Sequence, residues 1–159
     1  MRISLATSLH LDHGAMPPDP DPGQTLPMQS FVPVGLLSLK AYADRALGPK
    51  VDIRVEELNT LIAAGGIPND RDFHDHLASV ILGSGADMVG LMTDADSLHH
   101  TVLVAERVRA RSPRTLICVG GPTTSPMPAR FLERFPQFDL LVRGEGEATF
   151  AHLLETLDE

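Results

Sequence analysis

The sequence lacks tryptophan and contains a single cysteine, Cys118, among its 159 residues. One cysteine cannot form a disulfide framework, and it cannot by itself supply the thiolates of an iron–sulfur cluster. Such a chain suits the reducing cytoplasm, where we expect the protein to act. With six Phe and one Tyr, the chain also has few aromatic rings on which nucleic-acid bases could stack.

Long apolar runs and an excess of basic residues are also missing. No run approaches the roughly 20 residues of a membrane-spanning helix, and the first residues lack the apolar core and cleavage site of a secretory signal. The 13 Lys and Arg face 21 Asp and Glu, for a net charge of −8. Because nucleic-acid binding uses a basic face, we predict a protein that binds neither nucleic acid nor membrane.

The pattern that is present is an alternation of strands and helices. Short apolar or alternating runs predict five strands, at residues 2–8, 51–58, 87–93, 115–119 and 138–142. Apolar residues at helical spacing predict five helices, at residues 36–47, 73–81, 98–108, 129–135 and 148–157, with a short helical turn at 61–64. This alternation predicts one α/β domain over residues 1–159: a doubly wound, five-stranded parallel sheet, flavodoxin- or Rossmann-like, with strand order 2-1-3-4-5.

Ligands of such folds meet the loops that follow the carboxyl ends of the strands. The first of these loops, residues 9–30, is long, and six of the 13 prolines lie between positions 17 and 33. That density excludes a helix, and a loop of this length is usually functional or disordered. Two later loops carry glycine clusters, at 120–121 and at 144–146, where the backbone can approach a ligand or simply make a tight turn.

Four segments together resemble the N-terminal cobalamin-binding domain of cobalamin-dependent radical S-adenosylmethionine (SAM) enzymes. They are residues 31–42, with Pro-x-Gly-Leu at 33–36; residues 86–93; residues 108–122; and residues 139–150, with the turn Arg-Gly-Glu-Gly-Glu at 143–147. The resemblance covers essentially the whole chain. It implies that the chain holds cobalamin.

The spacing of the wider cobalamin-binding motif supports this resemblance, whereas some of its residues differ. Leu91-Met92-Thr93 stands where that family has Ser-x-Leu, and 26 residues separate Thr93 from Gly120-Gly121. The histidine motif Asp-x-His-x-x-Gly is absent, because in 10–14 the sequence reads His-Leu-Asp-His-Gly. The resemblance therefore implies base-off cobalamin, whose nucleotide base is displaced from cobalt, with no histidine ligand from the protein.

The resemblance, together with position at the carboxyl ends of strands, implies a set of cofactor-binding residues. They are Thr7, Ser8, Leu91, Met92, Thr93, Gly120, Gly121, Pro122, Thr123, Gly144, Glu145, Gly146 and Glu147. From the residues alone, tight turns, capping of the last helix by the glutamates and plain core packing of Leu91 are the alternatives. We assign no catalytic residue and no metal ligand.

Other polar residues of these loops have simpler explanations than ligand binding. We expect His10 and His13, as well as Asn69 and Arg71, to be solvated, although an imidazole is a natural metal ligand. The remaining candidates form a polar group after the third strand, where helix capping by Asp96 or Ser97 explains most of the pattern; they are Asp94, Asp96, His99 and His100.

The function that the resemblance implies is that of a cobalamin-binding module within a larger enzyme. A radical SAM domain, in cis or in trans, would supply the iron–sulfur cluster and S-adenosylmethionine, and we expect that enzyme to be a methyltransferase. The chain would then be a part of the enzyme or a separate subunit of it.

Three alternatives remain open at this point. The first is a degenerate domain that lost the cofactor and acts only through protein contacts. The second is a phospho-receiver, for which Asp94 fits but Thr7-Ser8 and Arg143 do not. The third is a flavin mononucleotide carrier, which needs a phosphate-binding loop where this chain has its proline-rich segment.

Overall fold

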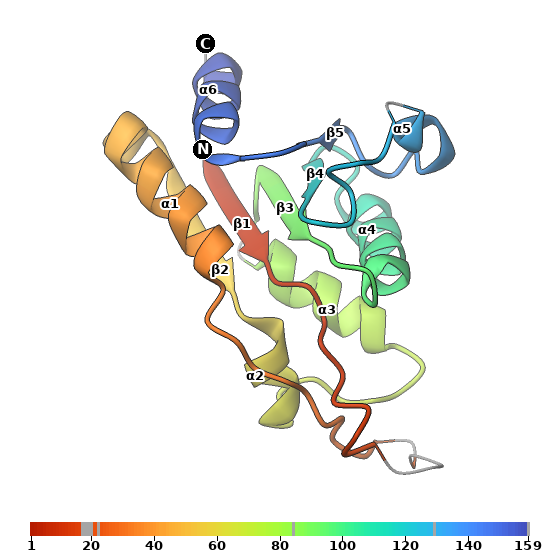
Figure 1. Cartoon of the computed structure of the whole chain (residues 1–159). Coiled ribbons are helices and arrows are strands. Elements are labelled where there is room, and N and C mark those ends of the chain that lie inside the picture. The colour runs from red at the N-terminus through yellow and green to blue at the C-terminus, as the bar shows by residue number, and fades with distance from the viewer. Residues whose placement is uncertain (17–20, 22, 84, 129, 159) are drawn as a thin grey trace.

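A parallel sheet of five strands forms the centre of the protein (Figure 1). The computed structural model describes residues 1–16, 21, 23–83, 85–128 and 130–158. The strands are β1 (Arg2–Ala6), β2 (Asp52–Glu56), β3 (Met88–Met92), β4 (Leu116–Gly120) and β5 (Leu140–Leu141). They are all parallel and lie in the order β2-β1-β3-β4-β5. The predicted doubly wound fold and its strand order are therefore confirmed.

Helices cover both faces of this sheet (Figure 1). On one face lie α1 (Val34–Leu47) and α6 (Glu147–Asp158), which contact each other, and the 3-10 turn η1 (Gly48–Lys50) follows α1. The core on the other face is built with α2 (Leu58–Ala63), α3 (Phe73–Leu82), α4 (Leu98–Arg111) and α5 (Phe131–Arg134). Among the described residues, no helix combines the length and the apolar character needed to cross a membrane.

The central strands are apolar on both faces because both faces are covered. Ile3 and Leu5 of β1 and Met88 of β3 pack in the core with α1 and α6. Val89 of β3 and Ile117 of β4 pack in the opposite core with α3 and α4. Successive side chains of a strand point to opposite faces, so near-continuous apolar runs are what a buried parallel sheet requires.

The second strand ends earlier than the sequence predicts, because a helix begins at Leu58. The carboxylate of Glu57 accepts hydrogen bonds from the backbone N–H groups of Asn59 and Thr60, at 3.2 and 2.7 Å. Helix α2 therefore overlaps the helical turn predicted at 61–64 but begins three residues earlier, in residues predicted as strand end and loop. Glutamate is not among the usual N-cap residues, so the sequence offers little signal for this start.

Helix α5 and strand β5 are shorter than predicted. Strand β5 spans two residues, but the N–H of Asp139 donates to Ile117 O at 2.8 Å and the N–H of Val142 donates to Val119 O at 2.9 Å. The ladder thus continues on both sides of the assigned strand. Helix α5 begins at Phe131, and residue 129, where the predicted helix starts, lies outside the described residues.

In the first loop, the described segments before and after residues 17–20 run antiparallel to each other, and some of their side chains pack in the core. Leu11 and Met28 form an antiparallel bridge, and the N–H of Asp12 donates to Pro27 O at 2.8 Å. Leu9 and Leu26 are buried in the core on the α3 face. The prediction of a loop holds for these parts, while residues 17–20 and 22 lie outside the described residues.

Candidate functional site

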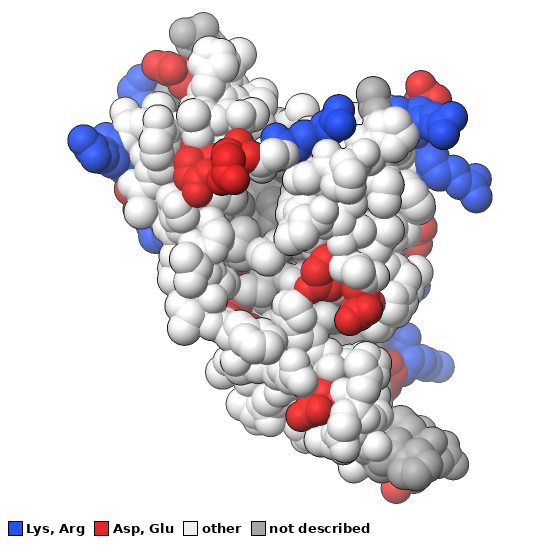
Figure 2. Space-filling view, viewed as in Figure 1, with Lys and Arg blue, Asp and Glu red and all other residues white. Residues whose placement is uncertain are grey.

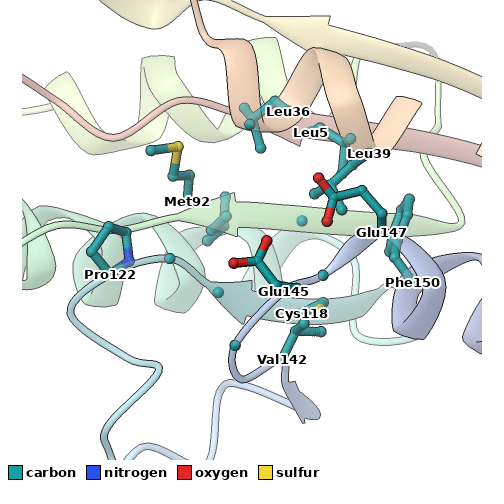
Figure 3. Close-up of a pocket in the computed structure, with 17 residues that line it drawn as sticks. Leu5, Leu36, Leu39, Met92, Cys118, Pro122, Val142, Glu145, Glu147 and Phe150 are labelled. Carbon is teal, nitrogen blue, oxygen red and sulfur yellow. The ribbon is translucent and has the colours of Figure 1, made fainter. Parts of the chain in front are cut away.

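A cavity of about 290 Å³ opens at the carboxyl end of the sheet, on the face covered by α1 and α6 (Figure 3). Its walls come from β1, β3, β4, the first turns of α1 and α6, and the β5–α6 turn. Nine of the 13 residues predicted to bind a cofactor line it: Leu91, Met92, Gly120, Gly121, Pro122, Gly144, Glu145, Gly146 and Glu147. The fold thus brings two glycine clusters that are far apart in sequence to one place.

The cavity exists largely because glycines line it. Six of the 13 glycines of the chain are among its lining residues. A Cβ atom at Gly90 would lie 2.6 Å from Leu5 Cδ2, and a Cβ at Gly120 would have its nearest neighbour, Val142 O, at 3.6 Å. A side chain at Gly90 would thus displace Leu5, whereas one at Gly120 has room and would extend into the cavity.

Gly121 has a different role from its neighbour. Its φ is +117°, a conformation that side-chain-bearing residues rarely adopt, and a Cβ there would lie 2.4 Å from Thr93 O. The backbone at this position requires glycine for its shape. The tight-turn explanation of the sequence therefore fits Gly121, while Gly120 leaves open space.

The rim of the cavity carries two carboxylates. The Ser38 hydroxyl on α1 donates to Glu147 Oε1 at 2.8 Å, and this bond is the main cause that lowers the pKa of Glu147. Glu147 is also the first residue of α6, where an acidic group favours the helix dipole. Figure 2 shows the hollow on this face, with uncharged residues inside it, acidic groups on its rim and basic groups at its upper edge. Helix capping and a place at the cavity mouth thus hold together for Glu147.

The turn between β5 and α6 is fixed to the loop after β4. The Arg143 guanidinium donates through Nε to Ser125 O at 2.9 Å, and the N–H of Gly144 donates to Ser125 Oγ at 3.1 Å. On the other side, a Cβ at Gly146 would lie 3.0 Å from Leu39 Cδ2. The turn is therefore held between two elements of the cavity wall.

Four of the predicted residues do not line the cavity: Thr7, Ser8, Thr93 and Thr123. The first three are buried, and their polar groups serve the protein itself. Thr7 Oγ1 accepts the N–H of Leu58 at 3.0 Å, and the N–H of Thr93 donates to Gly120 O at 2.9 Å. Their contact with a cofactor stays a prediction.

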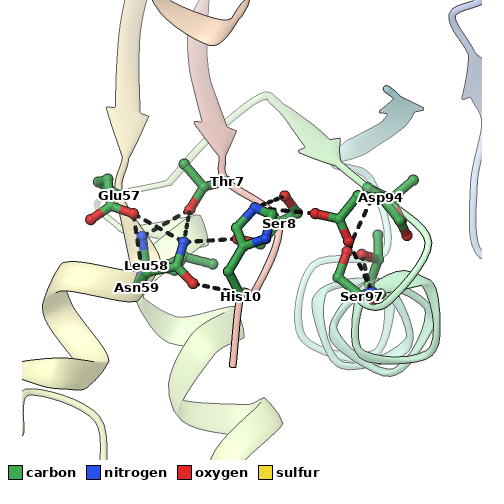
Figure 4. A network of polar contacts seen from close by, with 10 residues as sticks. Thr7, Ser8, His10, Glu57, Leu58, Asn59, Asp94 and Ser97 are labelled. Atoms are coloured by element: carbon green, nitrogen blue, oxygen red, sulfur yellow. Dashed lines mark hydrogen bonds and ion pairs between the residues drawn. The ribbon is translucent and has the colours of Figure 1, made fainter. Parts of the chain in front are cut away.

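A polar network at the ends of β1, β2 and β3 fixes the start of the first loop (Figure 4). His10 Nε2 lies 2.9 Å from Ser8 Oγ and 3.1 Å from Asp94 Oδ2. The N–H of His10 donates to Asn59 Oδ1 at 2.7 Å. The expectation that His10 is a solvated loop residue is therefore wrong, because contacts from three elements hold it.

The polar group after β3 divides into two parts. Asp94 forms a reciprocal turn with Ser97, since the N–H of each donates to the side chain of the other at 3.1 Å. His100 instead faces α3, where its Nδ1 lies 2.9 Å from His74 Nε2. Among the described residues, no three His, Cys, Asp or Glu side chains are placed to hold a metal ion.

The two facing histidines are electrically neutral at physiological pH. Burial, followed by the neighbouring His99 and His74, lowers the pKa of His100 to about 4. Burial is also the largest cause that lowers the pKa of His74. One ring can then donate to the other without charge repulsion.

Cys118 lies in the cavity wall as a structural thiol. Burial raises its pKa to about 12, so the thiol is not ionised near neutral pH. Since the thiolate is the reactive form of cysteine, the group acts here as a small apolar side chain.

Sequence reasoning missed eight lining residues: Leu5, Gly35, Leu36, Leu39, Gly90, Cys118, Val142 and Phe150. Gly90 carried a usable signal, because glycine inside a strand often marks the close approach of another group. Gly35 and Leu36 belong to the Pro-x-Gly-Leu segment of the resemblance. The others are apolar, and nothing in the sequence distinguishes a cavity wall from a filled core.

A doubly wound sheet with a glycine-lined apolar cavity at its carboxyl edge defines a module for a small molecule or a cofactor. The model of the B12 binding domain family matches residues 28–154 of the chain. This match covers well over half of the chain. The chain therefore belongs to the B12-binding domain family.

Several curated proteins are similar to parts of the chain. The chain is 36% identical over 70 residues to the cobalamin-dependent radical SAM methyltransferase TokK of Streptomyces tokunonensis, covering 44% of the chain. It is 35% identical over 91 residues, or 51% of the chain, to the 2-(S-pantetheinyl)-carbapenam-3-carboxylate methyltransferase of Streptantibioticus cattleyicolor. It is 28% identical over 148 residues, or 89% of the chain, to the anaerobic magnesium-protoporphyrin IX monomethyl ester cyclase of Synechocystis sp..

These relatives are much longer than the chain. The matched regions span 10%, 13% and 26% of their respective lengths. The similarity therefore concerns one part of each relative, and the activities in their names belong to the whole proteins.

Proposed function

We propose that this chain binds cobalamin base-off, with the displaced nucleotide tail in the cavity beside Gly120 and Gly121. The observation that carries the proposal is the open space beside Gly120, where an added Cβ would have its nearest neighbour at 3.6 Å. In a filled core, this strand position would hold a side chain that packs against α1 and α6. Membership of the B12-binding domain family supports the choice of cobalamin as the ligand.

The residues around the cavity would share the work of binding. Leu36 and Phe150 would contact the base, since both side chains lie in the cavity wall and are otherwise buried. Glu145 at the rim would accept hydrogen bonds from amide groups of the corrin ring. Gly121 would let the backbone pass close to the tail. Bound cobalt would supply the reactive centre, while the protein supplies orientation.

We propose further that no histidine of the chain coordinates cobalt. His10 is the histidine that follows β1, and its Nε2 already lies within hydrogen-bond distance of Ser8 and Asp94. Releasing it for a metal would break contacts at the ends of β1 and β3. The absence of the Asp-x-His-x-x-Gly motif supports the same conclusion.

The chain would serve as the cobalamin-binding domain of a larger methyltransferase. A radical SAM domain, in cis or in trans, would supply the iron–sulfur cluster and S-adenosylmethionine, since this chain has one cysteine, which is buried. The names of two relatives, both methyltransferases, support this assignment.

The test is to mix the protein with hydroxocobalamin, remove free cofactor by desalting and record the visible spectrum. We expect the protein to retain cobalamin with a base-off spectrum, and we expect the same spectrum from His10→Ala and His13→Ala. A colourless protein would contradict cobalamin binding and support a domain that acts through protein contacts alone. A spectrum that changes in His10→Ala would contradict the absence of a histidine ligand.

A further inference from the structure

We propose that the cavity selects among corrinoids by their lower nucleotide base, accepting an apolar benzimidazole base and disfavouring an adenine base. This inference rests on the proposed function, because it concerns the ligand of the same cavity. It adds a specificity that follows from the chemistry of the walls.

The interior of the cavity offers apolar side chains. Leu5 from β1, Leu36 and Leu39 from α1, Met92 from β3 and Phe150 from α6 surround it (Figure 3). None of these side chains donates a conventional hydrogen bond, and only the Met92 thioether accepts one, weakly. The volume of about 290 Å³ lies near the lower end of the range for ligand pockets, about 300–1,000 Å³. The apolar surface of the cavity suits a planar bicyclic base.

The carboxylates of the site lie at the rim of the cavity. Glu145 is exposed at the rim, and one oxygen of Glu147 already accepts the Ser38 hydroxyl. The backbone groups of the wall are partly used as well: the N–H of Val142 donates to Val119 O, and Gly120 O accepts the N–H of Thr93. Among the described side chains inside the wall, only the sulfur atoms of Met92 and Cys118 can meet an amino group, and they are weak partners.

The two bases differ in what they would bring into this interior. Dimethylbenzimidazole presents methyl groups, which an apolar wall accommodates. Adenine presents an exocyclic amino group and additional ring nitrogens, which lose their water without gaining partners. Both bases have a ring nitrogen that leaves cobalt in the base-off form. The free energy needed to desolvate this nitrogen is therefore similar for the two corrinoids. An apolar pocket rejects an added polar group by up to about a hundredfold.

The experiment measures dissociation constants of the whole chain for three corrinoids under base-off conditions. They are cobalamin, its adenine-containing analogue adeninylcobamide, and cobinamide, which lacks the nucleotide base. We expect cobalamin to bind about 10- to 100-fold more tightly than adeninylcobamide, and cobinamide to bind more weakly than cobalamin. Equal binding of cobalamin and adeninylcobamide overturns the inference and leaves the proposed function standing. Failure to bind any of the three overturns the proposed function itself.

A variant sharpens the test by adding a hydrogen-bonding group to the wall. In Met92→Gln, the new side chain has nearly the same length as the native one. The ratio of the dissociation constants for adeninylcobamide and cobalamin should fall about tenfold. Met127→Gln lies outside the cavity and is the matched control, for which we expect the native ratio. If Met92→Gln fails to fold, as judged by circular dichroism, Cys118→Ser changes a single atom of the wall and takes its place. An unchanged ratio in the folded variant overturns the inference.

Discussion

The two faces of the sheet differ at their carboxyl ends, although the same strands form both. On the α3–α4 face, Val89 of β3 and Val119 of β4 are buried in the core. On the α1–α6 face, Gly90 and Gly120 occupy the positions next to them along the strands, and a cavity of about 290 Å³ remains. At these strand positions, the α3–α4 face is closely packed, whereas the α1–α6 face leaves space that we assign to a ligand.

This difference arises from single positions and not from a change of fold. Gly90 pairs with Leu5 and Cys118, and Met92 pairs with Gly120 across the β3–β4 ladder. Small and large residues therefore alternate around the cavity on neighbouring strands. The binding capacity of such a sheet is therefore set by which alternate strand positions lack a side chain.

The largest effect should come from removing a side chain on the filled face. Ile81→Ala deletes three carbon atoms from a fully buried site in α3 and should lower the free energy of unfolding by about 3–4 kcal/mol. Leu36→Ala enlarges a space that is already open and should cost only about 1–2 kcal/mol. Urea denaturation measures both. Equal losses would contradict the difference between the two faces.

Adjacent glycines should respond differently to the same substitution. Gly121→Ala places a Cβ against Thr93 O in a conformation that alanine rarely adopts, and it should destabilise the fold by about 2–3 kcal/mol. Gly120→Ala meets its nearest neighbour at 3.6 Å and should change stability by less than about 1 kcal/mol. Thermal unfolding of the pair separates the two roles, and a large loss in Gly120→Ala would argue against open space there.

Acidification should weaken the filled face through its histidine pair. A histidine in the unfolded chain binds its proton near pH 6.5, whereas folding lowers the pKa of His100 to about 4 and also lowers that of His74. The unfolded state therefore binds more protons between these pH values, and stability falls as the pH drops from about 6.5 towards 4. His100→Gln should make this fall shallower, as measured by urea denaturation at several pH values. If His100→Gln lost as much stability on acidification as the native chain, the histidine pair would not be the cause of the loss.

The smallest effect should come from the hydrogen bond at the rim. Ser38→Ala removes the bond to Glu147 Oε1 and should lower the free energy of unfolding by less than about 1 kcal/mol, because the carboxylate regains water. Ser125→Ala, which removes the acceptor of the Gly144 N–H, offers a comparison on the other side of the turn. A loss above that of Leu36→Ala would show that the rim contributes more than the wall.

The fold could be predicted from the sequence because its determinants are local. Apolar strands such as 115–119 and helices ended by glycine repeat along the chain, and their alternation fixes the order of a parallel sheet. Gly120-Gly121 and the turn at 143–147 pointed to the carboxyl edge for the same reason. The start of α2 at Leu58 was missed because Glu57 is an unusual cap.

The finer parts of the site depend on contacts between distant segments. His10 and Asp94 lie 3.1 Å apart, and no local pattern connects two loops that follow different strands. In the sequence, Phe150 and Leu39 cannot be distinguished from core residues, because the apolar pattern is the same for a side chain that packs against protein and for one that lines a cavity. The fold determines which of these side chains border the cavity.

The central claim is that the hollow face receives the nucleotide tail of cobalamin. The measurement that tests it most directly compares the dissociation constants of cobalamin and cobinamide for the native chain, Gly120→Leu and the control Gly14→Leu, whose site lies outside the cavity. We expect Gly120→Leu to lose cobalamin affinity by about a hundredfold or more and to keep its affinity for cobinamide, while Gly14→Leu behaves as the native chain. Native cobalamin affinity in a folded Gly120→Leu variant would contradict the account.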